Sequence, residues 1–147
     1  MSNYLNRFEH LHETLPQNIK LLSRLSKYNI VELNLLNFSS TDFEDSYIID
    51  NYSEHLESGL LRYCKIENQK YFHMNGSKNL VHRSSTGNYY VNLDADNILT
   101  NEYLSDVLNC NRNNTVLIVG KADVPGTYGR IGVPKQLFDK ISGYDEF

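Results

Sequence analysis

Apolar residues recur every three or four positions over residues 5–15 and again over residues 19–25, which is the spacing of one helix face. Pro16 stands between the two stretches. A proline inside a helix removes one backbone hydrogen bond and clashes with the preceding turn. The pattern therefore predicts helical structure on both sides of Pro16, interrupted at the proline and continuing to Lys27.

Farther along the chain, short apolar runs bounded by polar residues alternate with stretches of helical spacing. The apolar runs predict strands at residues 30–38, 60–66, 88–93 and 115–119. The other stretches predict helices over about residues 43–56, 77–85, 100–108 and 134–141. Strands that alternate with helices form βαβ units. We therefore expect one α/β domain over residues 1–147, with a mostly parallel sheet flanked by helices.

The composition narrows the classes of function. The 147 residues carry 14 Lys and Arg against 18 Asp and Glu, a formal net charge of −4. We expect no nucleic-acid partner, because non-specific binding needs a basic surplus that displaces counterions from phosphates. We also expect no membrane span, since no stretch approaches the roughly 20 apolar residues required. Cys64 and Cys110 form no CxxC motif, and two free thiols indicate a reducing compartment and a cytoplasmic protein.

The strongest candidate chemistry follows the strand expected at residues 88–93, where Asp94-Ala95-Asp96-Asn97 stands. In an extended segment, side chains two positions apart share a face, so both carboxylates could bind one cation. Mg²⁺ and Mn²⁺ suit such a site when one or two carboxylates are joined by substrate phosphates and water. The alternative is a turn in which Asp and Asn side chains bond to backbone groups.

Two further segments could contact an anionic ligand. Gly76 and Ser77 stand near a helix start and precede Lys78, which suits a phosphate. A helix cap followed by a solvated lysine is the alternative. Arg130 stands between two glycines and could reach a phosphate or a sugar hydroxyl, although such a segment is also a common turn into a strand. We expect His82 to be a core or surface residue and not a catalyst.

Taken together, seven segments in a fixed order resemble family 2 glycosyltransferases, enzymes of the GT-A fold that transfer a sugar from a nucleotide donor. The segments are NR (6–7), ETLPQNI (13–19), NFSS (37–40), FHMNGSKN (72–79), YVNLDADN (90–97), GRIG (129–132) and SGYDE (142–146). The resemblance covers nearly the whole chain. It implies a GT-A-like, Rossmann-like sheet, a UDP-linked sugar donor, and a glycan or another hydroxyl compound as acceptor.

The resemblance also implies roles for single residues. Asp94 would contact the ribose or the metal, and Asp96 would bind Mn²⁺ or Mg²⁺ at the donor diphosphate. Gly129 and Arg130 match the strand that enters the floor of the sugar and acceptor site, and Arg7 matches the turn after the first strand. The positions that match the nucleotide-binding side are Asn37, Ser39, Ser40, Lys78, Asn79 and Asp94.

The chain departs from the family pattern in three ways. Only residues 1–5 precede the NR pair, so the first strand is short or absent. Asn37 replaces an Asp that commonly pairs with the base, and an amide offers a different hydrogen-bonding pattern. The family continues to an acidic motif with the catalytic base, which has no counterpart here. Asp145 and Glu146 are the nearest acids, so the catalytic residue is unassigned and the domain is incomplete at its acceptor side.

Three hypotheses of function remain. The first is a glycosyltransferase, or its nucleotide-sugar-binding part, that depends on a metal held by the DxD motif. The second is a shortened, non-catalytic relative that binds a nucleotide or a protein partner. A shortened chain would leave apolar faces uncovered and favour self-association. The third is a nucleotidyltransferase, which would need a nucleoside triphosphate site, and the sequence has no Gly-rich basic loop near its N-terminus.

Overall fold

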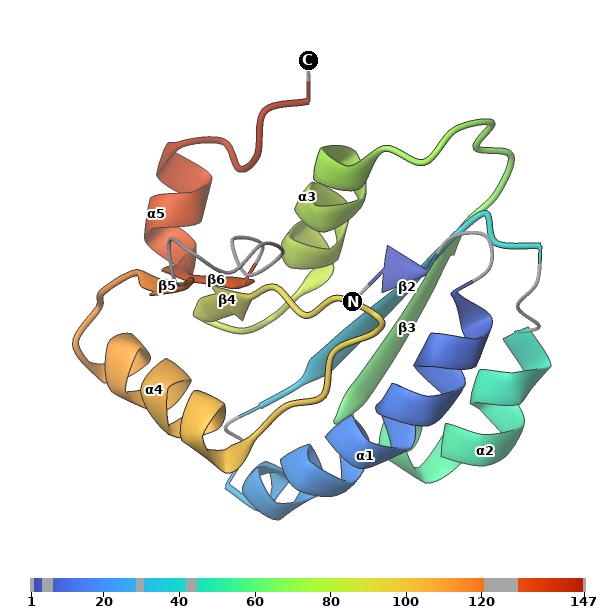
Figure 1. The fold of residues 1–147 in the computed structure, drawn as a ribbon, viewed down its shortest axis with the longest axis horizontal. Helices are drawn as coiled ribbons and strands as arrows, with labels where there is room; N and C mark the ends of the chain where they lie inside the picture. The colour runs from blue at the N-terminus through green and yellow to red at the C-terminus, as the bar shows by residue number, and fades with distance from the viewer. Residues whose placement is uncertain (1, 4–6, 29–30, 42–44, 121–129, 147) are drawn as a thin grey trace.

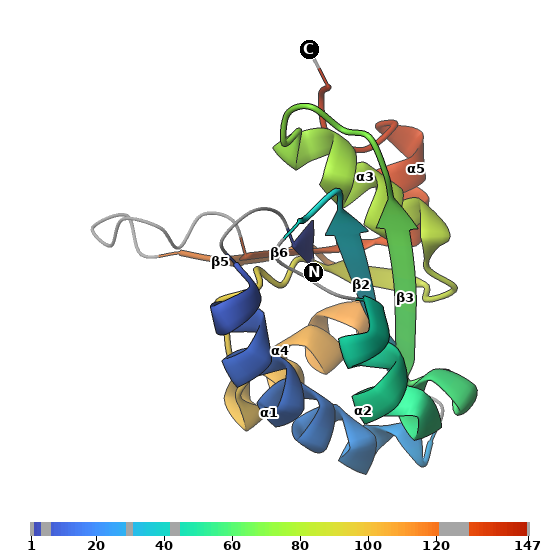
Figure 2. The same cartoon turned by 90° about the vertical axis from the view of Figure 1, so that its right-hand side faces the viewer.

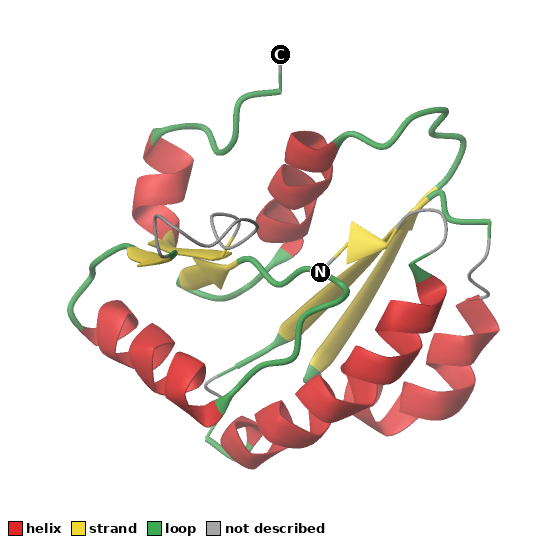
Figure 3. Ribbon diagram, viewed as in Figure 1, coloured by secondary structure: helices red, strands yellow, loops and turns green. Residues whose placement is uncertain are grey.

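The computed structural model describes residues 2–3, 7–28, 31–41, 45–120 and 130–146. Strands and helices alternate along these residues as far as β5, as Figures 1 and 3 show. In chain order they are β1 (Ser2–Asn3), α1 (Phe8–Ser26), β2 (Leu33–Phe38), α2 (Asp45–Glu57), β3 (Leu61–Ile66), α3 (Met74–Ser84), β4 (Tyr89–Val91), α4 (Asn101–Arg112), β5 (Leu117–Val119), β6 (Arg130–Pro134) and α5 (Lys135–Lys140). The expected elements are present with somewhat shifted bounds. The first strand, β1, is short, and β6 begins at Arg130, which the resemblance matched to a strand.

The strands form two sheets, which confirms the α/β class and refines the expected topology. The first sheet is parallel and has the order β1-β2-β3. The second has the order β4-β6-β5 and is antiparallel, because β6 returns between the two strands that precede it. The expected mostly parallel arrangement therefore holds for the first sheet alone among the described strands.

The centre of the parallel sheet is β2, and all six of its residues are buried. Leu33 and Leu35 pack into a core with the apolar faces of α1 and α2. Leu36 and Phe38 point to the other face and pack against Val81 of α3. Successive side chains of a strand point to opposite faces, so a strand covered on both sides carries apolar residues on both faces. Figure 2 shows the helices around β2 and β3 from the side.

The helix α1 runs without a break through Pro16, so the expected interruption is wrong. Its buried face carries Leu11, Leu15, Ile19 and Leu22, each at most 4% exposed. Pro16 lies on the exposed face. A carbonyl that loses its partner to a proline can bond to water there, so the packing of the buried face outweighs the proline's local cost.

Gly132 explains why the short strand β6 fits between its neighbours. A Cβ at this position would lie 2.8 Å from Cε1 of Tyr89 and 3.2 Å from Cβ of Leu117, on the two flanking strands. A glycine inside a strand often marks such a close approach. None of the helices in the described ranges is long and apolar enough to cross a membrane.

Candidate functional site

The segment Asp94–Asn97, called the acidic turn below, follows β4 and forms a turn. The amide of Asn97 donates to the carbonyl of Asp94 at 3.0 Å, and Ala95 between the acids is buried. The expected extended segment with both carboxylates on one face is therefore wrong. The two carboxylates instead project from the first and third positions of a turn, and each has its own basic partner.

Buried polar residues of α1 hold the acidic turn. The hydroxyl of Thr14 donates to the carbonyl of Ala95 at 2.6 Å. The amide group of Asn18 donates to the carbonyl of Asn97 at 2.9 Å and accepts from the backbone of Leu99 at 2.8 Å. Thr14 is 3% exposed and Asn18 is fully buried. These bonds fix the backbone that carries both acids, because an unpaired buried polar group is costly.

Replacing Thr14 with valine is expected to lower the free energy of unfolding by about 1–2 kcal/mol. The change keeps the shape of the side chain and leaves the carbonyl of Ala95 without its donor. Urea unfolding measures the effect. Thr115→Val is the control, since its exposed hydroxyl makes only a 3.4 Å contact with Cys110. Equal losses in the two variants would show that Thr14 does not hold the turn.

Each carboxylate of the acidic turn faces a cation. Lys78 of α3 lies 3.8 Å from Asp94, and Arg7 lies 3.2 Å from Asp96. The carboxylates are 46% and 45% exposed, whereas Lys78 is only 17% exposed. Arg130 of β6 donates to the side-chain oxygen of Asn97 in the same turn. The fold thus brings four sequence-predicted residues, Arg7, Lys78, Asp94 and Asp96, into one charged cluster, with Arg130 at its edge.

The donor set of this turn suits a hard divalent cation. Two accessible carboxylates can supply one or two oxygen ligands, and Mg²⁺ and Mn²⁺ accept such a small protein contribution when phosphates and water complete the shell. Across the described part of the chain, no group of three His, Cys, Asp or Glu side chains could hold a metal alone. A cation at Asp94 and Asp96 would therefore need oxygens from a ligand.

Asn37, Ser39 and Ser40 form a tight turn at the carboxyl end of β2. The side-chain oxygen of Asn37 accepts from the backbone of Ser40 at 2.8 Å, and its amide donates to the hydroxyl of Tyr63 at 3.2 Å. Ser39 has a left-handed φ of 57°, and its hydroxyl donates to the carbonyl of Ile66 at 2.9 Å. These contacts join the ends of β2 and β3. The nucleotide-binding role of the three residues stays a prediction.

A polar network that the sequence did not predict lies beside that turn. The hydroxyl of Tyr63 donates to Asp45, and the Lys65 ammonium lies 2.8 Å from the other oxygen of the same carboxylate. The bonds from Lys65 and then Tyr63 lower the pKa of Asp45. The available signal was the position of Lys65 near the carboxyl end of β3, because ligands of parallel sheets bind beyond the carboxyl ends of the strands.

The start of α3 differs from the expected phosphate cradle. The helix begins at Met74, and Nδ1 of the His73 ring accepts from the backbone of Gly76 at 2.9 Å. Ser77 is buried, and its hydroxyl donates to the carbonyl of Met74 at 2.9 Å. Within this segment Lys78 faces the acidic turn, whereas Asn79 faces residues 142–146. Gly129, the other expected sugar-side residue, lies outside the described residues.

His82 belongs to the core, as expected. It is 5% exposed, stacks on Tyr90 with ring centroids 5.0 Å apart, and shares a 2.9 Å hydrogen bond with Asn92. Burial lowers its pKa to about 4, and the positive charge of Lys78 acts in the same direction. The side chain is therefore neutral at physiological pH.

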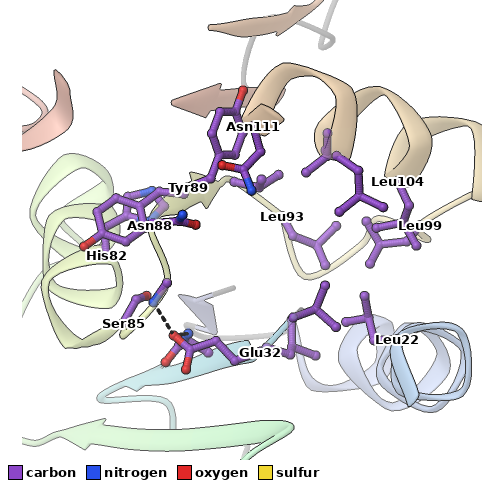
Figure 4. A pocket seen from close by; sticks show the side chains of 18 of the residues that line it. Leu22, Glu32, His82, Ser85, Asn88, Tyr89, Leu93, Leu99, Leu104 and Asn111 are labelled. Carbon is purple, nitrogen blue, oxygen red and sulfur yellow. Dashed lines mark hydrogen bonds between the residues drawn. The ribbon is translucent and has the colours of Figure 1, made fainter. Parts of the chain in front are cut away.

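Two hollows flank the loop that follows the acidic turn. One of about 260 Å³ is lined by Asn97, Thr100, Tyr103 and Arg130 among others. The second, of about 160 Å³, is shown in Figure 4 and lies between α1, β2, β4 and α4. Leucines dominate one side of it, at positions 22, 93, 99 and 104. The 260 Å³ hollow adjoins Arg130, so it lies on the side that the resemblance assigns to the sugar.

Comparison with known proteins shows the fold. No protein-family model matches the sequence, and no curated protein sequence matches it. A solved structure, S. aureus TarS 1-349, superposes with a TM-score of 0.70 at 15% sequence identity. TarS is a glycosyltransferase, so the chain has a glycosyltransferase-like α/β fold. The match covers 99% of this chain and 49% of TarS 1-349, so the chain spans about half the length of that protein.

Proposed function

We propose that the protein binds a UDP-linked sugar at the acidic turn and transfers the sugar to a hydroxyl of a glycan or another acceptor. The observation that carries the proposal is the cluster of Asp94 and Asp96 with Lys78 and Arg7, built on a glycosyltransferase-like fold. A cluster with carboxylates and cations suits a metal-bound diphosphate, because the carboxylates can bind the metal and the cations can bind the phosphates.

The residues of the cluster would divide the work of binding. Asp94 and Asp96 would hold Mn²⁺ or Mg²⁺, which would supply positive charge to the departing diphosphate. Lys78, mostly buried beside Asp94, and Arg7, beside Asp96, would donate to the phosphate oxygens. Arg130 bonds to Asn97 at the edge of the 260 Å³ hollow and would contact sugar hydroxyls. Asn37, Ser39 and Ser40 would lie on the side of the base.

One observation favours the second candidate function, nucleotide binding without turnover. Glu146, one of the two acids of the SGYDE segment, accepts from Asn79 at 2.7 Å and lies 3.9 Å from Arg83. Both contacts hold the carboxylate of Glu146 against α3. The proposal therefore assigns no catalytic base to this chain.

Titration of UDP with and without Mn²⁺ tests the donor site. Wild-type protein should bind UDP more tightly with Mn²⁺, and Asp96→Asn should weaken the metal-dependent binding about tenfold or more, because an ionised ligand is lost. Asp50→Asn, an exposed change on α2, is the matched control and should have no effect.

The outcomes separate the hypotheses. Absence of UDP binding in the wild type under both conditions would contradict the proposal. Metal-dependent binding followed by turnover of a UDP-sugar would support the glycosyltransferase, and binding without turnover would support the second candidate. A preference for a nucleoside triphosphate would favour a nucleotidyltransferase. We further propose a cytoplasmic location, supported by the two free cysteines, which suit a reducing compartment.

A further inference from the structure

Lys78 and Asn79 are neighbours on α3 but face different parts of the molecule. Lys78 points to Asp94 of the acidic turn, with 3.8 Å between Nζ and the carboxylate. Asn79 is 1% exposed and contacts residues 142–146, called the C-terminal segment below. Consecutive helical residues point about 100° apart, so one helix can connect two sites.

The amide of Asn79 is committed to the C-terminal segment. Its oxygen accepts from the backbone of Tyr144 at 2.8 Å. Its nitrogen donates to the carbonyl of Tyr144 at 2.8 Å and to the carboxylate of Glu146 at 2.7 Å. A primary amide has two N–H donors, and both are used here. A nucleotide could therefore bond to Asn79 only by displacing the segment.

The C-terminal segment also bonds to Asn92, which lies between β4 and the acidic turn. The amide of Asn92 donates to the hydroxyl of Tyr144 at 2.6 Å, and the oxygen of Asn92 bonds to buried His82 at 2.9 Å. Asn92 stands two residues before Asp94. Tyr144 thus connects to α3 through Asn79, which is next to Lys78 in the chain. It connects to the acidic turn through Asn92, which is two residues before Asp94.

We infer that Asn79 is a positioning residue that acts through the C-terminal segment, and that Asn79 and Tyr144 together set the separation of Lys78 and Asp94. The packed position of the C-terminal segment then stabilises the acidic turn, and the folded acidic turn stabilises that position of the segment. This coupling is reciprocal, so a ligand bound at the turn also tightens the segment. The ligand part of the inference rests on the proposed function, whereas the coupling within the free protein does not.

Amide hydrogen exchange of the free protein tests the coupling directly. Asn79→Asp keeps the size and one acceptor of the side chain but places oxygen against the carbonyl of Tyr144 and the carboxylate of Glu146. Exchange should accelerate about tenfold at Tyr144 and also at Asn97, whose amide closes the acidic turn. Tyr144→Phe, a milder change that removes only the bond from Asn92, should accelerate exchange at Asn97 too. Asn113→Asp, on the exposed end of α4, is the matched control.

UDP binding with Mn²⁺ supplies the second measurement on the same variants. Asn79→Asp and Tyr144→Phe should each weaken it about fivefold, and UDP should slow exchange at residues 144–146 of the wild type. Weaker binding with unchanged exchange would identify Asn79 as a direct ligand and overturn the inference. Faster exchange at Tyr144 without a change at Asn97 would also overturn it. A wild type that fails to bind UDP would contradict the proposed function but not the coupling. The coupling is tested separately by hydrogen exchange at Asn97 in the free protein.

Discussion

Replacing Gly143 with alanine is expected to lower the free energy of unfolding by about 3 kcal/mol. Gly143 has a φ of +81°, a conformation that costs other residues roughly 1–2 kcal/mol. A Cβ there would also clash with the side-chain oxygen of Asn79 and lie 2.9 Å from the ring of Phe138. Both neighbours are buried, so neither can move away without breaking other contacts.

Gly59→Ala separates the two causes of that loss. Gly59 ends α2 with a φ of +75°, and no atom lies within 4 Å of the position of its Cβ. Only the conformational cost of roughly 1–2 kcal/mol applies there. Urea unfolding of both variants measures the difference. Equal losses would mean that the contact with Asn79 relaxes at no cost, and that the C-terminal segment is not held in one position.

Acidification from pH 7 to pH 4 is expected to remove about 3 kcal/mol of stability through His82. Burial lowers the pKa of this side chain from 6.5 to about 4. Between those values the unfolded chain binds a proton that the folded protein does not bind, so stability falls as the pH falls. The loss begins near pH 6.5 and is complete below about pH 4, where both states are protonated.

Unfolding measured at several pH values tests this dependence. His82→Gln should remove most of the slope between pH 6.5 and pH 5, where most carboxylates are still ionised. The stability of the variant at pH 7 does not affect this comparison, because the slope is the measured quantity. His10→Gln, at an exposed position of α1, is the matched control. A slope that persists in His82→Gln would mean that other groups cause it.

The elements with a clear period were predictable from the sequence. The apolar face of α1 and the buried run in β2 each depend on local spacing, and both are present. The continuity of α1 through Pro16 was not predictable, because it depends on which face the fold covers. The strand β6 is short and contains Gly132, and its place depends on Tyr89 and Leu117, which are distant in sequence.

The charged residues of the candidate site were predictable, whereas their supports were not. Lys78 and Asp94 were found because they stand in short motifs, and the structure brings them together. Thr14 and Asn18 stand about 80 residues from the backbone they hold, with separations of 81 and 79 positions. No periodic pattern records such a contact. Asn79 was assigned by analogy to the nucleotide side, but its actual contacts are with Tyr144 and Glu146.

The contact between Asn79 and the C-terminal segment also affects the order in which parts of the chain fold during translation. Asn79 and Tyr144 are 65 positions apart, and a ribosome makes Asn79 first. The side-chain amide of Asn79 is buried in the folded protein, where it bonds to Tyr144 and Glu146. Until Tyr144 leaves the exit tunnel, these partners of Asn79 are absent from the folding chain. The parallel pair β2 and β3, with the helix between them, is available earlier, because these two strands pair with each other. Co-translational folding should therefore begin in the N-terminal half and close last at α3.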